Sequence, residues 1–196
     1  MDAMQELGNI GAAHAATTLS QMLSSSVEMS VPKIKVVDIS QLSNHMGEES
    51  AALVVFELQG EIPHGGYIIF YISRKSAVHL TNTMLGLTDP DRPLNEMDES
   101  ALIEVGNIMA SAFLDATAEL LGFVMLPSPP SLTIDMAHAA MQTLIAQMQE
   151  EIDEVMLFST ELVCAEHKID SDIIMMPETS TLAMFVERLE NLMKSG

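Results

Sequence analysis

Apolar and polar positions follow two different periods along this chain. In segments 2–23 and 98–121 apolar residues recur every three or four positions, which predicts two long amphipathic helices. Other segments are short, rich in β-branched residues, and either alternating or continuously apolar, which predicts strands. The predicted strands are 31–39, 51–60, 66–73, 131–136, 154–164 and 171–177, with a hairpin at 61–66, and shorter helices are predicted at 76–86, 137–150 and 180–193.

The predicted elements follow the same order in the two halves of the chain. A shift of 98 residues, from Glu6 to Glu104, produces more identities than composition alone would give. We interpret this as a tandem duplication. The helix at 137–150 is the exception, because the first half has only a polar stretch, 40–50, in its place.

One shared sheet is the simplest fold for two such halves. Each half predicts three strands, too few to bury both faces of a sheet by itself. We therefore expect a single α/β (α+β) domain over 1–196, a pseudo-twofold duplication with about six strands in one sheet and the two long helices covering it. Prolines and acidic residues mark 87–99 as the linker between repeat one (1–86) and repeat two (100–196).

The charge and the cysteine content narrow the class of protein. The 28 acidic and 8 basic residues give a formal charge of −20, which disfavours nucleic acid and anionic membranes as partners. Uninterrupted apolar runs stay well short of the roughly 18 residues of a membrane helix, and the N-terminus has no basic leader. The single cysteine, Cys164, lies in a predicted strand and fits a buried structural thiol. Together these features predict a soluble, cytoplasmic protein.

The two long helices carry the same short motif. Glu-x-Gly-Asn-Ile occupies residues 6–10 and again 104–108. Glutamate and asparagine three positions apart point to the same side of a helix, and this stripe extends back to Asp2 in one copy and to Ser100 in the other. Glycine costs a helix interior about 0.5–1 kcal/mol relative to alanine, so its repetition needs a reason. Either another backbone approaches there, or the carboxylate and the amide are held rigidly for a ligand.

The motif lacks the parts of a free-standing hydrolase. The sequence shows no serine or cysteine nucleophile with a positioned base, and no glycine-rich phosphate loop. The six histidines have no metal-ligand spacing and are expected to be surface or packing residues: His14, His45, His64, His79, His138 and His167. A carboxamide can nevertheless orient a water molecule, and phosphoryl transfer needs little more than alignment and charge compensation. A Glu–Asn pair therefore suits a half-site that completes a metal-bearing site on another protein.

The doubled pattern Asp/Ser-x3-Glu-x2-Asn, with Gly-Asn-Ile embedded, resembles the CheC branch of the CheC/CheX/FliY phosphatases. The resemblance extends over essentially the whole chain and includes the segments GNIGAAHAATTLSQML and LLGFVMLPSPPSLTIDM. It implies a pseudo-twofold α/β fold and hydrolysis of the aspartyl phosphate of the chemotaxis response regulator CheY. It also implies that the regulator supplies Mg²⁺, so that the protein needs no cofactor or metal of its own.

The resemblance also assigns roles to the motif residues. The asparagine would orient the attacking water, the glutamate would engage a basic residue of the regulator, and the first residue would support the motif. The two sets are Asp2, Glu6 and Asn9, called site 1 here, and Ser100, Glu104 and Asn107, called site 2. Because the first motif starts at residue 2, where a terminus frays, we expect site 2 to be the stronger.

Two other functions fit the same resemblance. The family implies a partner, CheD, a receptor glutamine deamidase whose binding can raise CheC activity, so the chain could instead be an adaptor that regulates CheD with weak or no phosphatase activity. Flagellar switch proteins share the fold and bind without hydrolysis, but they carry extra terminal segments for docking. This chain ends directly after the helix predicted at 180–193. We expect the phosphatase first and the CheD adaptor as its alternative.

Overall fold

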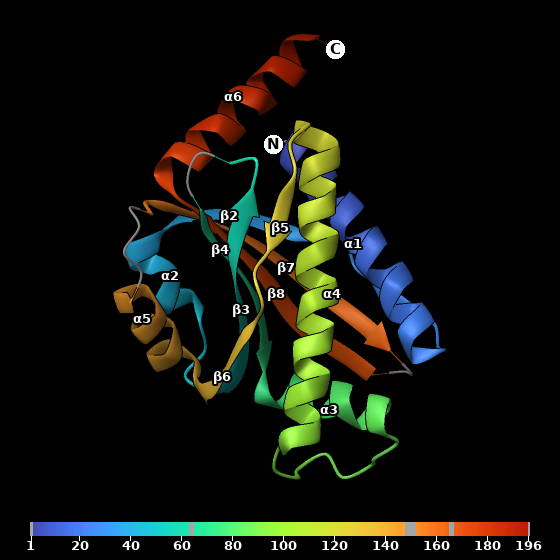
Figure 1. The fold of residues 1–196 in the computed structure, drawn as a ribbon. Helices are drawn as coiled ribbons and strands as arrows, with labels where there is room; N and C mark the ends of the chain where they lie inside the picture. The colour runs from blue at the N-terminus through green and yellow to red at the C-terminus, as the bar shows by residue number, and fades with distance from the viewer. Residues whose placement is uncertain (1, 63–64, 148–151, 165–166, 196) are drawn as a thin grey trace.

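The computed structural model describes residues 2–62, 65–147, 152–164 and 167–195. Its helices surround one antiparallel sheet (Figure 1). The first half contains α1 (Asp2–Leu23), β1 (Val27–Met29), β2 (Lys33–Asp38), α2 (Ile39–His45), β3 (Ser50–Gly60), β4 (Gly66–Ser73) and α3 (Arg74–Leu85). The second half contains α4 (Glu96–Leu121), β5 (Met125–Pro127), β6 (Ser131–Met136), α5 (Ala137–Gln147), β7 (Glu154–Cys164), β8 (His167–Pro177) and α6 (Thr179–Ser195).

The sheet joins the two halves by exchanging their edge strands. Its central order is β7–β8–β4–β3, and every pair of neighbours is antiparallel. Strands β1 and β2 of the first half pair along the outer edge of β7, whereas β5 and β6 of the second half pair along the outer edge of β3. Each half therefore covers a strand edge that the other would leave open. The predicted mixed α/β fold, with two long helices over one shared sheet, is confirmed.

Across the described residues the sheet has eight strands, two more than the sequence predicts. The additional strands, β1 and β5, are three residues long, which is too short to show an alternating pattern. They do not widen the sheet. Strands β1 and β2 follow one another along β7, and β5 and β6 follow one another along β3.

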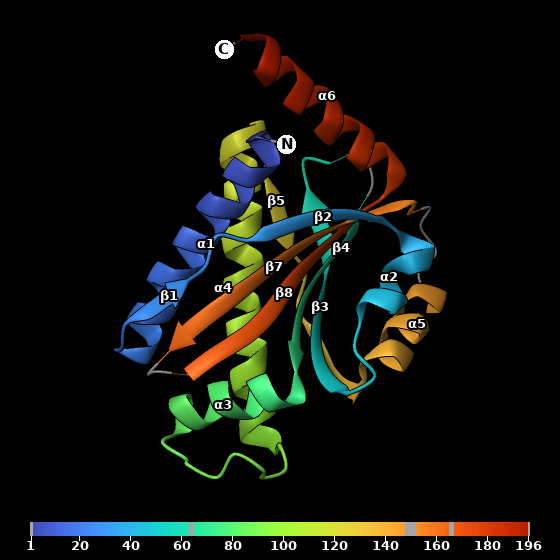
Figure 2. The same cartoon turned by 180° about the vertical axis from the view of Figure 1, so that it is seen from behind.

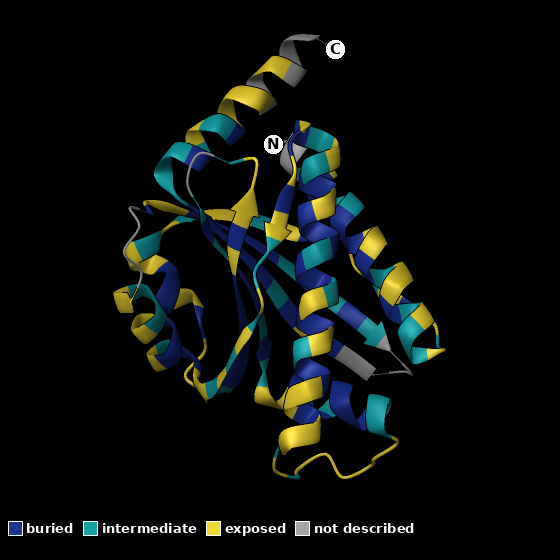
Figure 3. Cartoon of the chain, viewed as in Figure 1, coloured by how far each residue is buried: buried dark blue, intermediate teal, exposed yellow. Residues whose placement is uncertain are grey.

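Two apolar cores lie on opposite faces of the sheet. Strand β3 contributes to both: Val54 and Phe56 belong to the core under the long helices, and Leu53 and Val55 to the core under α2 and α5. Helices α1 and α4 lie side by side over the first face and run in opposite directions, while α2 and α5 lie together against the second (Figure 1, Figure 2). Figure 3 shows that α4 alternates buried residues on its inner side with exposed residues on its outer side.

The polar stretch at 40–50 holds a helix that the sequence did not predict. Helix α2 forms there because the Asp38 side chain accepts a hydrogen bond from the backbone of Ser40 (2.8 Å) and Leu42 is buried. The two halves are therefore more alike than predicted, with α5 as the longer counterpart of α2. The end of the helix predicted to reach residue 150, the turn of the predicted hairpin and the side chain of Cys164 lie outside the described residues.

Helix α4 is long and apolar enough to cross a membrane, judged by length and composition alone. The sequence expectation differed because it considered only uninterrupted apolar runs, and Glu104 and Asp115 interrupt this one. In the fold 61% of the apolar window is buried. The core helix of a globular domain passes the same test, so this feature is weak evidence for a membrane span.

Helix α4 begins at Glu96, inside the predicted linker 87–99. A capping box starts it: the Asn95 side chain accepts a hydrogen bond from the Met97 backbone, and the Asp98 side chain accepts one from the Asn95 backbone, each at 2.8 Å. The observed connection is therefore shorter than predicted. The division into repeats stays a prediction.

A buried ion pair fixes the start of α4 to α3. Arg92 donates two hydrogen bonds to Asp98, from Nη1 to Oδ2 (2.7 Å) and from Nη2 to Oδ1 (2.6 Å). Its other donors reach Oδ1 of Asn82 (2.7 Å), Oγ1 of Thr81 (3.0 Å) and the Pro93 carbonyl (3.3 Å). Every N–H group of the guanidinium thus has an acceptor. The Asp98 side chain is fully buried, and its hydrogen bonds from Arg92 lower its pKa to about 2.

Acidification should remove the stabilisation that Asp98 contributes. Its pKa is about 2 in the fold against an ordinary 3.8, so the ionised carboxylate favours the folded state. This contribution is complete above about pH 4 and is lost as the pH falls toward about 2, and it amounts to at most about 2 kcal/mol. Urea unfolding at about pH 5 and about pH 2.5 measures it.

Asp98→Asn provides the comparison for this measurement. The variant leaves Arg92 without its ion-pair partner, so its free energy of unfolding at about pH 5 should fall by about 3 kcal/mol. Its unfolding free energy should also depend less on pH than that of the wild type. An equal pH dependence in the two proteins would show that another group is responsible.

Candidate functional site

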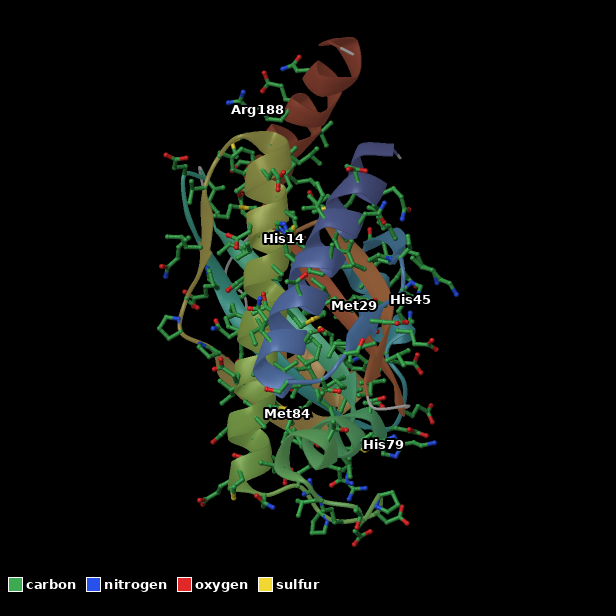
Figure 4. All side chains as sticks on the ribbon, turned by 90° about the vertical axis from the view of Figure 1, so that its right-hand side faces the viewer. His14, Met29, His45, His79, Met84 and Arg188 are labelled. Atoms are coloured by element: carbon green, nitrogen blue, oxygen red, sulfur yellow. The ribbon has the colours of Figure 1, made fainter. Side chains whose placement is uncertain are left out.

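The motif residues form two separate sites on neighbouring helices. Site 1 lies on α1 and site 2 on α4, and the two helices lie side by side in Figure 4. Because the helices run in opposite directions, the two sites are displaced from each other along the pair. Asn107 shares a groove with Thr17 and Thr18, which are about 12 Å of helix beyond Asn9. The structure therefore does not bring the two Glu–Asn pairs into one cluster.

Site 2 presents its polar groups to solvent. Glu104 and Asn107 are exposed, and the exposed Ser100 donates from Oγ to the Glu96 carbonyl (2.9 Å). Asn107 also borders the α1–α4 groove. The residues that line this groove are Asn107, Ile108, Ser111, Ala112 and Asp115 from α4 and His14, Thr17 and Thr18 from α1. A carboxamide in this position can bind a water molecule and a docked partner at once, since it both donates and accepts hydrogen bonds.

Site 1 holds its asparagine differently. Glu6 is exposed, but Oδ1 of Asn9 is buried and has no hydrogen-bond partner among the described residues. A buried carbonyl oxygen without a partner costs about 1–3 kcal/mol. Asp2 lies at the start of α1, and its side chain is outside the described residues. The two copies of the motif are thus unequal in structure, which supports the ranking of site 2 over site 1 for a reason other than fraying.

The two glycines of the motif are in different surroundings. A Cβ at Gly106 would lie 2.8 Å from Cβ of Val54 and 2.9 Å from both of its γ-carbons, so α4 rests directly on β3. A Cβ at Gly8 would make ordinary contacts, 3.4 Å from Ile34 and 3.5 Å from Phe158. Close packing therefore explains the glycine of site 2. It does not explain the glutamate and the asparagine beside it, because these side chains are exposed.

The sequence does not reveal the second wall of the groove. It predicts His14 to be a surface or packing residue, yet His14 lines the groove that Asn107 borders. No pattern along the chain pairs α1 residues with α4 residues, because their contact depends on how the two helices pack. The start of α4, by contrast, is visible in the sequence, since Asn95 and Asp98 have the spacing of a capping box.

The functional groups at the two sites are carboxylates and carboxamides. Within the described part of the chain, no three His, Cys, Asp or Glu side chains come together as they would around a metal ion. The sites themselves can attract a basic side chain and orient a water molecule.

Comparison with known proteins finds a family that is similar to both motif segments. The model of the CheC-like family matches residues 1–36 and 97–134. Each matched segment contains one copy of the motif, and the two end at equivalent positions, Val36 and Ile134. The resemblance to the CheC family is confirmed.

Curated relatives extend this similarity over most of the chain. The CheY-P phosphatase CheC of Bacillus subtilis is 28% identical over 185 residues, which cover 91% of this chain and 88% of that protein. The putative CheY-P phosphatase CheC1 of Halobacterium salinarum is 27% identical over 190 residues, which cover 96% of this chain and 95% of that protein. Both names describe enzymes that act on phosphorylated CheY.

Solved structures share the fold. FliY of Thermotoga maritima matches with a TM-score of 0.75 over 97% of this chain and 95% of its own, at 21% identity. The CheX of Borrelia burgdorferi, in a complex with CheY, BeF3 and Mg²⁺, matches with a TM-score of 0.52 over 87% of this chain and 98% of its own, at 23% identity. At these identities the matches establish the fold.

Alanine should be tolerated at Gly8 and not at Gly106. Gly106→Ala places a methyl group against Val54, and overpacking of this kind costs about 1–3 kcal/mol, which outweighs a helix-propensity gain of about 1 kcal/mol. Gly8→Ala should keep most of that gain and be neutral or stabilising. Urea unfolding of the two variants measures the difference, with Gly8→Ala as the matched control. Equal stabilities would mean that α4 can lift from β3 without cost.

Proposed function

We propose that this CheC-like chain dephosphorylates the aspartyl phosphate of the response regulator CheY. The observation that carries this function is site 2, an exposed Glu104–Asn107 pair on a helix that Gly106 holds directly against the sheet. The relatives named CheY-P phosphatase support the reaction. The complex of CheX with CheY supports the partner. We place the activity in the cytoplasm, as the sequence predicts.

In this reaction the partner supplies both the phosphorylated aspartate and the Mg²⁺. Asn107 supplies a carboxamide that holds a water molecule in line with the phosphorus–oxygen bond. The water attacks phosphorus, the bond from phosphorus to the aspartate oxygen breaks, and the products are the free carboxylate and inorganic phosphate. The acceleration comes from alignment, so a side chain on a firmly packed helix suits the task.

Glu104 is proposed to dock the partner. Its exposed carboxylate lies one turn before Asn107 on the same helix and would pair with a basic residue of CheY near the phosphorylated site. The net charge of −20 favours a partner with such basic residues. Glu6 and Asn9 are proposed to act in the same way but more weakly, because Oδ1 of Asn9 is buried.

Replacing Asn107 should slow the decay of phosphorylated CheY more than replacing Asn9. Asn107→Ala removes the group that orients the water, and misplacing a reacting group costs about 10- to 100-fold in rate. Asn9→Ala should cause a smaller loss, and the double variant should lose nearly all activity. The measurement is the decay of phosphorylated CheY with Mg²⁺ and each variant, with the exposed Asn44→Ala on α2 as the matched control. A larger loss for Asn9→Ala would reverse the ranking of the sites.

Removing the charge of Glu104 should weaken docking rather than chemistry. Glu104→Gln should raise KM for phosphorylated CheY by about fivefold with kcat nearly unchanged, since an exposed ion pair contributes up to about 1 kcal/mol. The effect should shrink at high ionic strength. Steady-state kinetics at two salt concentrations measure both constants, and the exposed Glu48→Gln serves as control. A fall in kcat at constant KM would assign Glu104 to the chemical step.

The alternative function, regulation of CheD, makes a different prediction for the same proteins. An adaptor should bind CheD equally well as the wild type and as the Asn9→Ala/Asn107→Ala double variant. If the wild type does not accelerate the decay of phosphorylated CheY even with CheD present, the adaptor becomes the leading interpretation.

A further inference from the structure

The α1–α4 groove joins site 2 to a helix from the other half of the chain. Asn107 lies on the α4 wall, and the opposite wall consists of His14, Thr17 and Thr18. The walls are close because the helices pack tightly: a Cβ at Gly11 would lie 3.0 Å from a phenylalanine ring of α4. A typical interface covers about 800 Å² on each partner, and packed helices are about 8–10 Å apart. A protein that covers Asn107 therefore also covers the α1 wall.

On this wall His14 is the side chain best placed to bind an incoming group. The hydroxyls of Thr17 and Thr18 already donate to carbonyls of their own helix, at Ala13 (2.8 Å) and at His14 (3.1 Å). The imidazole of His14 is exposed and lies where α1 passes α4 (Figure 4). Its ring nitrogens can donate to or accept from a partner.

His14 also differs in charge from the rest of the groove. Among the eight lining residues it is the one with a basic side chain, while Asp115 is acidic and the others are uncharged. Phosphorylated CheY presents an anionic group, and this chain carries a net charge of −20. A hydrogen-bond donor at this place would therefore complement the anionic group of the partner.

The duplication does not repeat this feature. A shift of 98 residues takes His14 to Ala112, which offers only a methyl group. The α1 wall thus distinguishes site 2 from site 1 independently of the buried Oδ1 of Asn9.

We propose that His14 is a docking residue for phosphorylated CheY at site 2, so that the binding surface is built from both halves of the chain. The inference rests on the proposed function and adds to it a residue outside the Glu–Asn motif. His14 contributes to binding and takes no part in aligning the water. Its removal therefore affects KM and Kd rather than kcat.

Two single-site proteins, each lacking the asparagine of the other site, distinguish an effect of His14 on docking from an effect on folding. In Asn9→Ala, where site 2 acts alone, adding His14→Ala should raise KM for phosphorylated CheY about three- to tenfold and leave kcat within about twofold. In Asn107→Ala, where site 1 remains, the same substitution should have a clearly smaller effect on KM, because the groove that His14 lines includes Asn107 and not Asn9. His14→Gln keeps a donor and should recover part of the loss. His45→Ala, which removes an exposed histidine on α2, is the matched control.

Binding of CheY carrying beryllofluoride and Mg²⁺ tests the same surface without hydrolysis. A Kd about three- to tenfold weaker for His14→Ala supports docking on α1 even if no protein accelerates hydrolysis, in which case only the proposed phosphatase activity fails. Equal binding by the wild type and His14→Ala overturns the docking role. An equal loss in both single-site proteins also overturns it, because it would mark a structural effect. No binding by the wild type overturns both proposals.

Discussion

The contact between Gly106 and Val54 fixes the height and the rotation of α4 on the sheet. Because Gly106 has no side chain, the helix rests directly on the side chain of Val54 and cannot roll without creating a clash or a void, and close-packed interiors resist both. Asn107 is the next residue, so its direction away from the sheet follows from that contact. A site that works by alignment depends on such support more than on the number of its functional groups.

Because the two halves of the chain share one sheet, the strand that supports α4 comes from the other half. Val54 belongs to β3 of the first half, whereas Gly106 belongs to α4 of the second. At the other site Gly8 of α1 lies against Ile34 of β2 and Pro32, both in its own half, as well as against Phe158 of β7. The helix of site 2 therefore rests on a long strand from the opposite half. Site 2 does not belong to one repeat alone, because the groove beside Asn107 also takes one wall from α1 of the first half.

The sequence predicts what local periodicity controls and misses what packing controls. The long helices, the paired central strands and the two Glu–Asn pairs could be placed because their spacing along the chain is regular. The three-residue strands and the seven-residue α2 could not, because each has too few residues to form a pattern, and the Arg92–Asp98 pair could not, because the spacing of these two residues does not show that they meet. The groove wall at His14 needs the relative position of two helices, which no single segment encodes.

The difference between the two sites shows most clearly that the sequence does not predict what packing controls. Glu-x-Gly-Asn-Ile is written identically in both copies, yet Asn107 is exposed and Oδ1 of Asn9 is buried without a partner. Packing alone does not account for an unpaired buried oxygen, because an apolar side chain of similar size would avoid its cost of about 1–3 kcal/mol. This free-energy cost would be removed if the Asn9 amide turned toward solvent or a partner. In the proposed function, site 1 therefore differs from site 2 at its asparagine: the buried Oδ1 of Asn9 would have to turn outward before it could accept a hydrogen bond from a water molecule, whereas Asn107 is exposed.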